Sequence, residues 1–430
     1  MRAKLPLLSA LVLGALSGVV ATGCQSYDFE PVEPLAIAQT TVEETITALA
    51  SKPNVMMLVD VSGSMTSPVN PSHPSCKVDR GDGTMVVCGG QLPCPTATCP
   101  TRWTELQAAV PGFLETTGKH VRFGLTTYPE SEKGDTSDAC NASSSLSIRK
   151  DLPAEEGDAA LQLHATSIIN VIKGIPNAGT GRPLGGTPTS GSMTFLGNLP
   201  SMQDKERKNF VILLTDGLPN CNVNNEYSGR TEPVQCKCTI ATTPGAPDQC
   251  ASTTFYERRG CLDTNASVAA VRDLKEKGIT TIVIGFGAET ASGDGPVVLQ
   301  AMATAGGFAR SCTDDPTACG SNDTCNPVTG LCGRSFYQAG NQTELADALE
   351  RISKEVRNTE PCLIRLKGPQ LPSDPKLIVV YVEGERILGG SDTWELTGDG
   401  VRFNGATCER IKNSRPEAPV KIEIRAIRQR

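Results

Sequence analysis

The sequence predicts an α/β fold, with a doubly wound and mainly parallel sheet, disulfide-rich loop insertions and a small C-terminal β unit. Two observations predict this architecture. Strands that are apolar almost throughout alternate with amphipathic helical segments, which is typical of a parallel sheet covered on both faces. Between these elements lie long segments rich in cysteine, proline and glycine, without a helical period, which is typical of loops held by disulfides.

The main domain is expected over residues 54–357. Valine, isoleucine and leucine dominate its predicted strands, at 55–60, 121–128, 210–216, 280–287 and 335–339. Apolar residues at helical spacing predict the helices between them, at 104–117, 157–175, 265–278, 297–307 and 343–356. The stretch 144–152 is expected to form an antiparallel edge strand beside 121–128.

Three insertions interrupt this pattern, at 66–101, 221–261 and 312–333. The first two each follow a strand that ends in aspartate, so we expect both to emerge at the carboxyl edge of the sheet. The third precedes a strand and is expected to emerge elsewhere. Its acids Asp314, Asp315 and Asp323 raise calcium binding as an alternative, but their spacing fits no twelve-residue calcium loop. A disulfide knot is therefore the preferred interpretation.

The pattern of apolar and polar residues changes after residue 357. Apolar and polar residues alternate with period two, and Glu383-Gly384 and Asp399-Gly400 are typical of hairpin turns. This pattern predicts a small β-rich unit over 358–430.

The first 23 residues resemble a bacterial lipoprotein signal. Arg2 and Lys4 precede an apolar run at 5–21, and small residues then lead to Cys24. The resemblance implies lipidation of Cys24 and an exported protein anchored in the bacterial cell envelope, with the outer membrane favoured. Ordinary signal cleavage and an uncleaved membrane span are the alternatives.

Residues 24–53 are predicted to form a polar tether between the lipid and the main domain. The stretch 41–49 within it also fits a short strand or helix.

Cysteine usage agrees with export. Removing Cys24 from the 17 cysteines leaves 16, an even number that suits disulfides. Zinc is the alternative for Cys236 and Cys238, but the chain has only 3 histidines and lacks the paired C-x-x-C blocks of structural zinc sites. The pairing cannot be derived from the spacing, except that Cys362 and Cys408 form a natural pair because they stand apart from the rest.

Oxygen-bearing side chains follow the first predicted strand, in the stretch DVSGS at 60–64. Alternate residues of an extended segment point the same way, so Asp60, Ser62 and Ser64 present one carboxylate and two hydroxyls to a common point. Gly63 lets the backbone turn there without crowding.

Two further segments are expected at the same place. The strand 210–216 ends in Asp216, and parallel pairing brings that carboxylate to the edge that holds Asp60. The turn 183–189 supplies the hydroxyl of Thr187. Oxygen ligands of this kind suit a hard divalent cation, with Mg²⁺ first and Mn²⁺ and Ca²⁺ as alternatives. The alternative for all three segments is a set of ordinary turns bonded to nearby backbone N–H groups.

This constellation resembles the metal ion-dependent adhesion site of von Willebrand factor type A domains. The resemblance rests on D-x-S-x-S at 60–64, Thr187 in G-G-T-P and Asp216 in T-D-G, and it covers residues 54–357. It implies that Ser62, Ser64 and Thr187 bind the metal directly, and that Asp60 and Asp216 do so directly or through water. The first two cysteine-rich loops are longer than is usual in the family, which bears on the partner rather than on the metal.

Several functions follow from a hydroxyl-rich cation site. Neutral ligands leave the charge of the cation poorly compensated, so it attracts an acidic group of a partner protein or polysaccharide. The leading interpretation is therefore an anchored binding protein. A net charge of −7 argues against nucleic acid as the main partner. An envelope scaffold that binds without metal is the alternative. A metal-dependent hydrolase is less favoured, since the site segments contain no histidine and no G-x-S-x-G elbow surrounds the serines.

Overall fold

The computed structural model describes residues 41–48, 52–130, 138–205, 207–222, 224–225, 236–239, 250, 259–313, 315–320, 323–357, 362–365, 374–397, 400–412 and 420–427. The expected signal at 1–23 and its Cys24 lie outside these residues. In the part of the chain that the structure does describe, no helix combines the length and apolar character needed to cross a bilayer.

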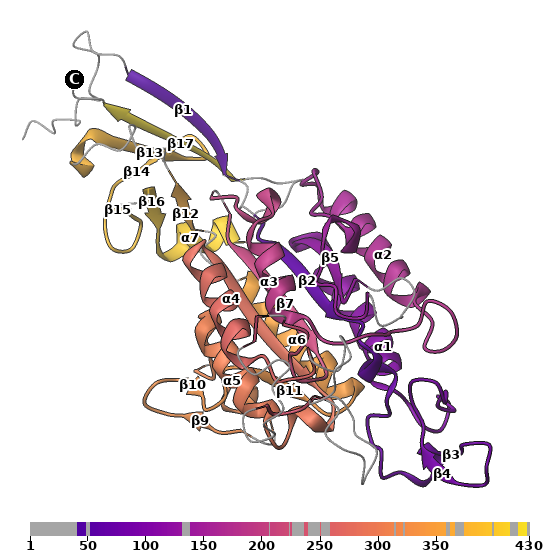
Figure 1. The fold of residues 1–430 in the computed structure, drawn as a ribbon. Helices are drawn as coiled ribbons and strands as arrows, with labels where there is room; N and C mark the ends of the chain where they lie inside the picture. Colours follow the sequence, from indigo (N-terminus) through magenta and orange to yellow (C-terminus); the bar gives the residue numbers. More distant parts are fainter. Residues whose placement is uncertain are drawn as a thin grey trace, which may run out of the picture.

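A six-stranded, mainly parallel sheet forms the centre of the main domain (Figure 1). Its strands are β2 (Asn54–Asp60), β5 (Arg122–Tyr128), β6 (Ile148–Lys150), β7 (Asn209–Thr215), β8 (Ile279–Phe286) and β11 (Tyr337–Ala339). The order is β11-β8-β7-β2-β5-β6, with only β6 antiparallel to its neighbour. The predicted edge strand within 144–152 is therefore confirmed, in shorter form.

Helices cover both faces of this sheet. They are α1 (Arg102–Thr117), α2 (Asp158–Gly174), α3 (Thr189–Gly197), α4 (Thr264–Glu276), α5 (Gly295–Gly306) and α6 (Gln342–Arg357). All residues of β2 are buried, and its side chains alternate between two cores. Val55, Met57 and Val59 pack with α1, α2 and α6, whereas Met56 and Leu58 pack with α3, α4 and α5. The unbroken apolar strands of the sequence are explained by this double burial.

The first two insertions emerge where the sequence predicts. One begins just after β2 and contains the hairpin of β3 (Lys77–Asp79) and β4 (Met85–Val87), and the other follows β7. The third carries β9 (Cys325–Asn326) and β10 (Leu331–Cys332) and rejoins the sheet at β11. It therefore stands beside the β11 edge of the sheet.

Over the residues that the structure describes, the C-terminal unit consists of two small sheets and one α-helix. Its elements are β1 (Thr41–Ala48), β12 (Leu363–Arg365), β13 (Ile378–Val382), β14 (Glu385–Ile387), β15 (Trp394–Thr397), β16 (Gly400–Phe403), α7 (Gly405–Lys412) and β17 (Val420–Ile427). Two expectations change here. The helix α7 was not predicted, because the alternation of apolar and polar residues in this unit indicates β-strands only. Part of the expected tether, β1, pairs antiparallel with β17 along its whole length, so the strand alternative holds for that stretch.

All 16 cysteines other than Cys24 form disulfides. The pairs are Cys76–Cys99, Cys88–Cys94, Cys140–Cys221, Cys236–Cys261, Cys238–Cys250, Cys312–Cys325, Cys319–Cys332 and Cys362–Cys408. Cys236 and Cys238 thus bind sulfur partners within their own insertion. Cys362 and Cys408 form the pair that their isolation in the sequence predicts.

Candidate metal centre

Asp60 lies at the carboxyl end of the central strand β2 and is completely buried. Its Oδ1 accepts a hydrogen bond from the backbone N–H of Ser62 at 2.8 Å. Its Oδ2 accepts from the Thr215 hydroxyl at 2.8 Å and from the Tyr128 hydroxyl at 3.4 Å. Among the described residues no lysine or arginine forms an ion pair with it. Asp60 is therefore a buried acid that is held in place by neutral donors.

Ser62, Ser64 and Asp216 form a continuous hydrogen-bonded row. The Ser62 and Ser64 hydroxyl oxygens lie 2.9 Å apart, and the Ser64 hydroxyl donates to Asp216 Oδ1 at 2.9 Å. Asp216 directly follows β7, the neighbour of β2, and is also completely buried. Parallel pairing thus brings the two aspartates to one edge of the sheet, as the sequence predicts.

Thr187 reaches the same edge on a loop that is bound to the β2 turn. The Leu184 N–H donates to Val61 O at 2.7 Å, and the Gly63 N–H donates to Gly185 O at 2.9 Å. Thr187 is 4% exposed. It exchanges two hydrogen bonds with Asn220, from its own N–H to Asn220 Oδ1 at 2.7 Å and from the Asn220 N–H to its carbonyl at 2.9 Å.

The Thr187 hydroxyl is not part of the hydrogen-bonded row of Ser62, Ser64 and Asp216. The structure records no hydrogen bond from that hydroxyl to another described residue. Of the five predicted residues, the structure therefore brings Asp60, Ser62, Ser64 and Asp216 together, and it places Thr187 on the adjoining loop.

The disulfide Cys140–Cys221 packs against this loop at Gly186. A Cβ atom on Gly186 would lie 2.5 Å from the Cys221 Sγ, and a Cβ on Gly185 would lie 2.7 Å from the Ala139 carbonyl oxygen. Gly185 also has a φ of +90°, which L side chains rarely adopt. The Gly-Gly pair of the sequence is thus required both by the turn and by the close approach of the disulfide.

Arg102 is a third charged group at the site, beside Asp60 and Asp216, and no motif in the sequence indicates it. It is the first residue of α1 and 3% exposed. Its Nη1 donates to Asp216 Oδ2 at 2.7 Å, and its Nη2 donates to Glu289 Oε1 at 2.9 Å. The sequence does contain an indication of this role. A positive charge in the first turn of a helix interacts unfavourably with the helix dipole, so Arg102 at the start of α1 is expected to need an acidic partner.

The electrostatics of the two buried aspartates differ. Burial, and then the charge of Asp216, raise the pKa of Asp60 to about 7. Burial also raises the pKa of Asp216, but Arg102 opposes this shift. Burial alone lowers the pKa of Arg102, yet its two carboxylate partners raise it above the usual value. Arg102 is therefore charged, and Asp60 is the acid whose negative charge is least compensated.

The donor set fits a hard divalent cation. It consists of oxygen atoms only, from two buried carboxylates and the hydroxyls of Ser62 and Ser64, with the hydroxyl of Thr187 nearby. A buried carboxylate without a cationic partner is costly, so a bound cation would remove an unfavourable charge at Asp60.

The first two insertions border this edge. The Thr66 hydroxyl donates to Gly63 O at 2.8 Å and accepts from the Gly90 N–H at 2.9 Å, which connects the first insertion to the β2 turn. The second insertion returns to the sheet through the Asp263 N–H, which donates to Pro219 O at 2.8 Å. Both insertions therefore begin within a few residues of the candidate ligands.

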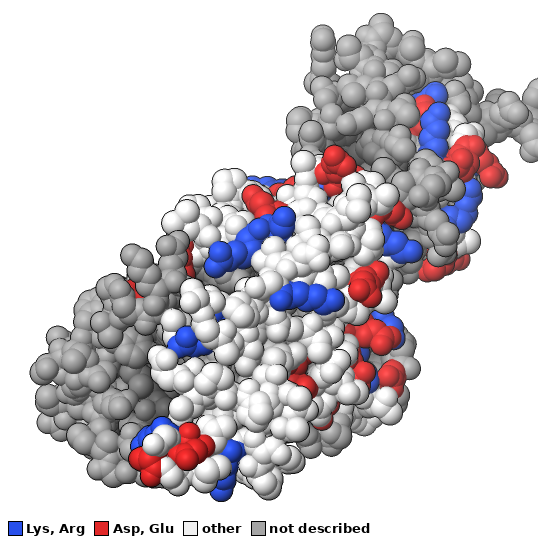
Figure 2. Space-filling view, turned by 90° about the vertical axis from the view of Figure 1, so that its right-hand side faces the viewer, with Lys and Arg blue, Asp and Glu red and all other residues white. Residues whose placement is uncertain are grey.

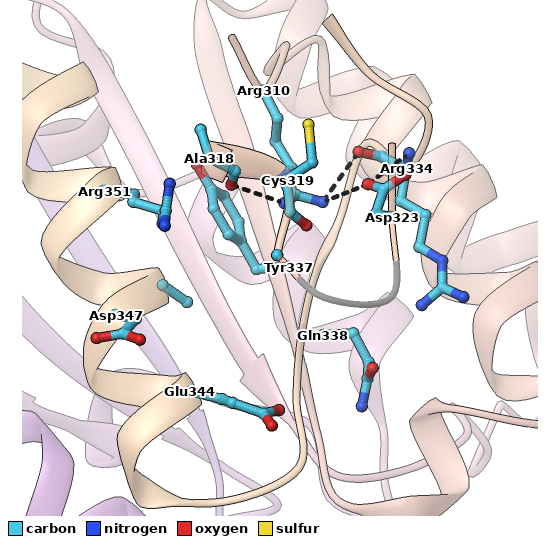
Figure 3. Close-up of a pocket in the computed structure, with 12 residues that line it drawn as sticks. Arg310, Ala318, Cys319, Asp323, Arg334, Tyr337, Gln338, Glu344, Asp347 and Arg351 are labelled. Carbon is cyan, nitrogen blue, oxygen red and sulfur yellow. Dashed lines mark hydrogen bonds and ion pairs between the residues drawn. The ribbon is translucent and has the colours of Figure 1, made fainter. Parts of the chain in front are cut away.

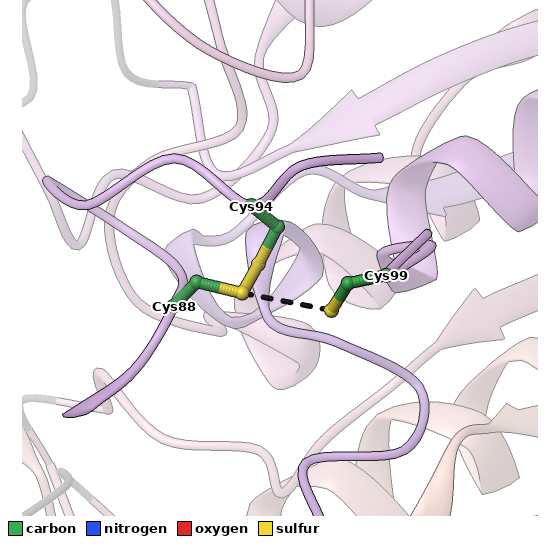
Figure 4. Close-up of side chains that lie close together, drawn as sticks. All are labelled: Cys88, Cys94 and Cys99. Carbon is green, nitrogen blue, oxygen red and sulfur yellow. Dashed lines mark hydrogen bonds between the residues drawn. A yellow bond between two sulfur atoms is a disulfide. The ribbon is translucent and has the colours of Figure 1, made fainter. Parts of the chain in front are cut away.

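Among the described residues, the clusters of cysteines consist of disulfide-bonded sulfur atoms. Cys88, Cys94 and Cys99 lie together in the first insertion (Figure 4), but Cys88 is bonded to Cys94 and Cys99 to Cys76. Disulfide sulfur atoms are not thiolates and do not bind zinc as thiolates do.

A cavity of about 270 Å³ lies between the third insertion, β11 and α6 (Figure 3). Arg310 lines it, but the Arg310 guanidinium bonds Asp323 at 3.1 Å and the carbonyls of Cys319 and Phe336 at 2.9 Å each. Arg351 pairs with Asp315 at 3.4 Å. These arginines are thus bonded within the protein, and their contacts connect the third insertion to α6 and to the start of β11. Asp315 and Asp323, two of the acids that suggest calcium, are the partners of those arginines, and Asp314 lies outside the described residues.

The charge on the visible surface is mixed. On the face drawn in Figure 2, Lys and Arg alternate with Asp and Glu, and neither sign forms a continuous field over the described residues. This agrees with the modest net charge.

Comparisons with known proteins give only weak likenesses. No family model and no curated protein matches the chain in sequence. Among solved structures, it is similar to the PilB minor pilin from Streptococcus sanguinis (16% identity, TM-score 0.38, 71% of this chain and 61% of that chain). It is similar to the pilus adhesin SpaC from Lactobacillus rhamnosus GG (14%, 0.37, 90% and 42%) and to manganese-loaded Plasmodium vivax TRAP protein (13%, 0.32, 62% and 67%). The chain thus spans less than two thirds of the length of the first two proteins, and at these TM-scores the likeness carries no functional argument.

Proposed function

We propose that this protein binds a divalent cation through Asp60, Ser62, Ser64, Thr187 and Asp216, and uses it to hold an acidic group of a partner. The observation that supports this best is the buried Asp60 carboxylate, which has no cationic partner among the described residues yet adjoins a row of hydroxyls. Mg²⁺ is the expected ion, with Mn²⁺ and Ca²⁺ as alternatives.

The partner contact follows from the ligand charges. Two of the five expected ligands are carboxylates, and Asp216 already shares its charge with Arg102. A cation held in this way keeps much of its charge and gains most from one more anionic oxygen. The partner would be a protein or a polysaccharide that carries a carboxylate or another acidic group. The two disulfide-bonded insertions that border the site would select among such partners.

The proposal includes the cellular setting. With lipidation at Cys24, the protein would be exported and anchored to a membrane of the bacterial envelope, with the outer membrane favoured. We infer a binding role rather than catalysis, because the contacts recorded among the described residues of the site are with hydroxyls, backbone amides, Asn220 and Arg102, and none of these is with a histidine. An envelope scaffold that binds without metal is the second candidate, and the ion pair of Arg102 with Asp216 favours it, since that pair already neutralises one acid.

Calorimetric titration of Mg²⁺ and Mn²⁺ into the chain with Cys24→Ser, beside Asp60→Asn, tests the proposal. Asparagine keeps the shape of the side chain but removes the charge, so we expect the affinity to fall more than tenfold. Asp392→Asn, which changes an exposed acid of the C-terminal unit, is the matched control and should bind as the wild type does. Equal affinities for all three, or partner capture that persists in EDTA, would favour the scaffold.

A further inference from the structure

The fold builds a dedicated place for the Arg102 side chain. Its backbone N–H donates to Ser67 O at 3.0 Å, and Thr101 caps the helix immediately before it. The side chain then passes over Gly287, where a Cβ atom would lie 3.0 Å from the Arg102 Nε and where φ is +96°. Because Gly287 has no side chain, the Arg102 side chain has room to cross it and reach Asp216 at the candidate metal centre.

The guanidinium bridges a buried acid and an exposed one. Nη1 bonds Asp216 Oδ2 at 2.7 Å, while the other oxygen of Asp216 accepts from Ser64. On its outer side, Nη2 bonds Glu289 Oε1 at 2.9 Å, and Nη1 lies 3.4 Å from Oε2. The Glu289 side chain is 59% exposed and belongs to a short 3-10 turn, Ala288–Thr290, after β8.

We propose that Arg102 is a resident counter-cation that lowers the affinity of the site for a divalent cation, and that Glu289 limits this effect. The inference rests on the proposed metal site. A divalent cation and Arg102 would both draw on the charge of Asp216, and like charges at such short range repel. Arg102 also occupies Asp216 Oδ2, which leaves Oδ1 facing the row of hydroxyls.

The same arrangement explains how the site depends on its partner. A cation that is weakly held by the protein alone is held more firmly once an acidic partner group supplies the missing charge. Glu289 opposes Arg102, because its carboxylate lies on the outer side of the guanidinium and partly neutralises it. Arg102 and Glu289 therefore set the cation affinity in opposite directions.

The test is the Mn²⁺ affinity of two charge-removing variants, measured by calorimetry on the full chain with Cys24→Ser. Arg102→Gln removes the positive charge and leaves a polar side chain of shorter reach, so Mn²⁺ should bind about tenfold more tightly. Glu289→Gln removes one of the two carboxylates that neutralise the charge of Arg102, so Mn²⁺ should bind several-fold more weakly. Glu276→Gln, an exposed acid at the end of α4 and hence at the opposite edge of the sheet, is the matched control and should bind as the wild type does.

Each outcome decides between the inference and the proposed function. Mn²⁺ binding by wild type with the same affinity in Arg102→Gln and Glu289→Gln overturns the inference and leaves the metal site standing. Binding by none of the proteins at millimolar Mn²⁺ overturns both. Binding by Arg102→Gln alone supports the inference in its strongest form. If Arg102→Gln fails to fold, the Glu289→Gln variant, whose substitution is at an exposed position, provides the test. Weaker Mn²⁺ binding by Glu289→Gln supports the inference, and unchanged Mn²⁺ binding overturns it.

Discussion

At the scale of single residues, the site consists of a few buried polar groups whose partners are set by strand ends. Asp60 and Asp216 end neighbouring parallel strands, which explains why the sequence pattern located both. Arg102 was missed because it lies 42 residues beyond Asp60 in the chain and carries no motif; only the packing of α1 brings it to Asp216.

The raised pKa of Asp60 predicts a pH dependence of stability in the cation-free protein. The folded state raises this pKa from 3.8 to about 7, so it favours the protonated acid. The contribution to stability is present at acid pH and is lost as the pH rises from about 4 through about 7, by at most about 4 kcal/mol. In EDTA, the melting temperature of wild type should therefore fall more between pH 6 and pH 8 than that of Asp60→Asn. Equal slopes for the two proteins would contradict this assignment.

The close contact at Gly186 predicts a second effect. In Gly186→Ala the new Cβ would lie 2.5 Å from the Cys221 Sγ, so the loop or the disulfide must shift. We expect a loss of about 1–3 kcal/mol in the free energy of unfolding, because overpacking has this cost, and weaker Mn²⁺ binding, because Thr187 is the next residue. Gly174→Ala is the control, since a Cβ there meets nothing within 4 Å. Denaturant unfolding of both variants measures the difference.

At the scale of elements, disulfides connect the described residues of the two insertions that begin next to the site. The predicted helices and strands of the main domain were found with ends shifted by a few residues, since 3.6-residue and unbroken apolar patterns report burial directly. The pairing of cysteines was not predictable, apart from Cys362 and Cys408. Sequence spacing says nothing about which loops meet, and Cys140–Cys221 joins residues 81 apart.

The disulfide Cys140–Cys221 is expected to control the Thr187 loop. Cys140→Ser with Cys221→Ser should lower stability by about 2–5 kcal/mol, speed hydrogen exchange at 183–189 and weaken Mn²⁺ binding. The double variant Cys312→Ser with Cys325→Ser, in the third insertion, should lose stability but keep its Mn²⁺ affinity. Hydrogen exchange and calorimetry on both pairs make the comparison, and an unchanged Thr187 loop in the first pair would refute the expected control.

At the scale of the whole molecule, the first and last described strands of the chain pair with each other. β1 pairs with β17, which joins a stretch before the main domain to the C-terminal unit after it. The polar composition of 24–53 predicted a tether, because a strand at the edge of a small sheet does not need the apolar run that marks a central strand. The helix α7 was missed for a related reason: it has eight residues and lies between period-two segments.

Deleting residues 1–48 should therefore destabilise the C-terminal unit without affecting the metal centre. The deletion exposes the edge of β17, and we expect the melting temperature of that unit to fall, with a cost of a few kcal/mol from the lost strand pairing. Mn²⁺ affinity should not change. A deletion of residues 1–40, which keeps β1, is the control. Equal melting of the two truncated proteins would show that β1 contributes nothing to the unit.

The α/β class, most helices and strands of the main domain and four residues that meet at one sheet edge follow from the amino-acid sequence alone. The periodicity of side chains depends on neighbouring residues, and parallel pairing then brings the strand ends together. The other seven disulfide pairs, the docking of β1 on β17 and the burial of Arg102 between Asp216 and Glu289 became known only with the tertiary structure. Each of these depends on how distant segments approach one another, and no pattern of neighbouring residues encodes that approach. The charge balance at the candidate metal centre also depends on the tertiary structure, since it is set by Arg102 of α1 and by Glu289 of the turn after β8.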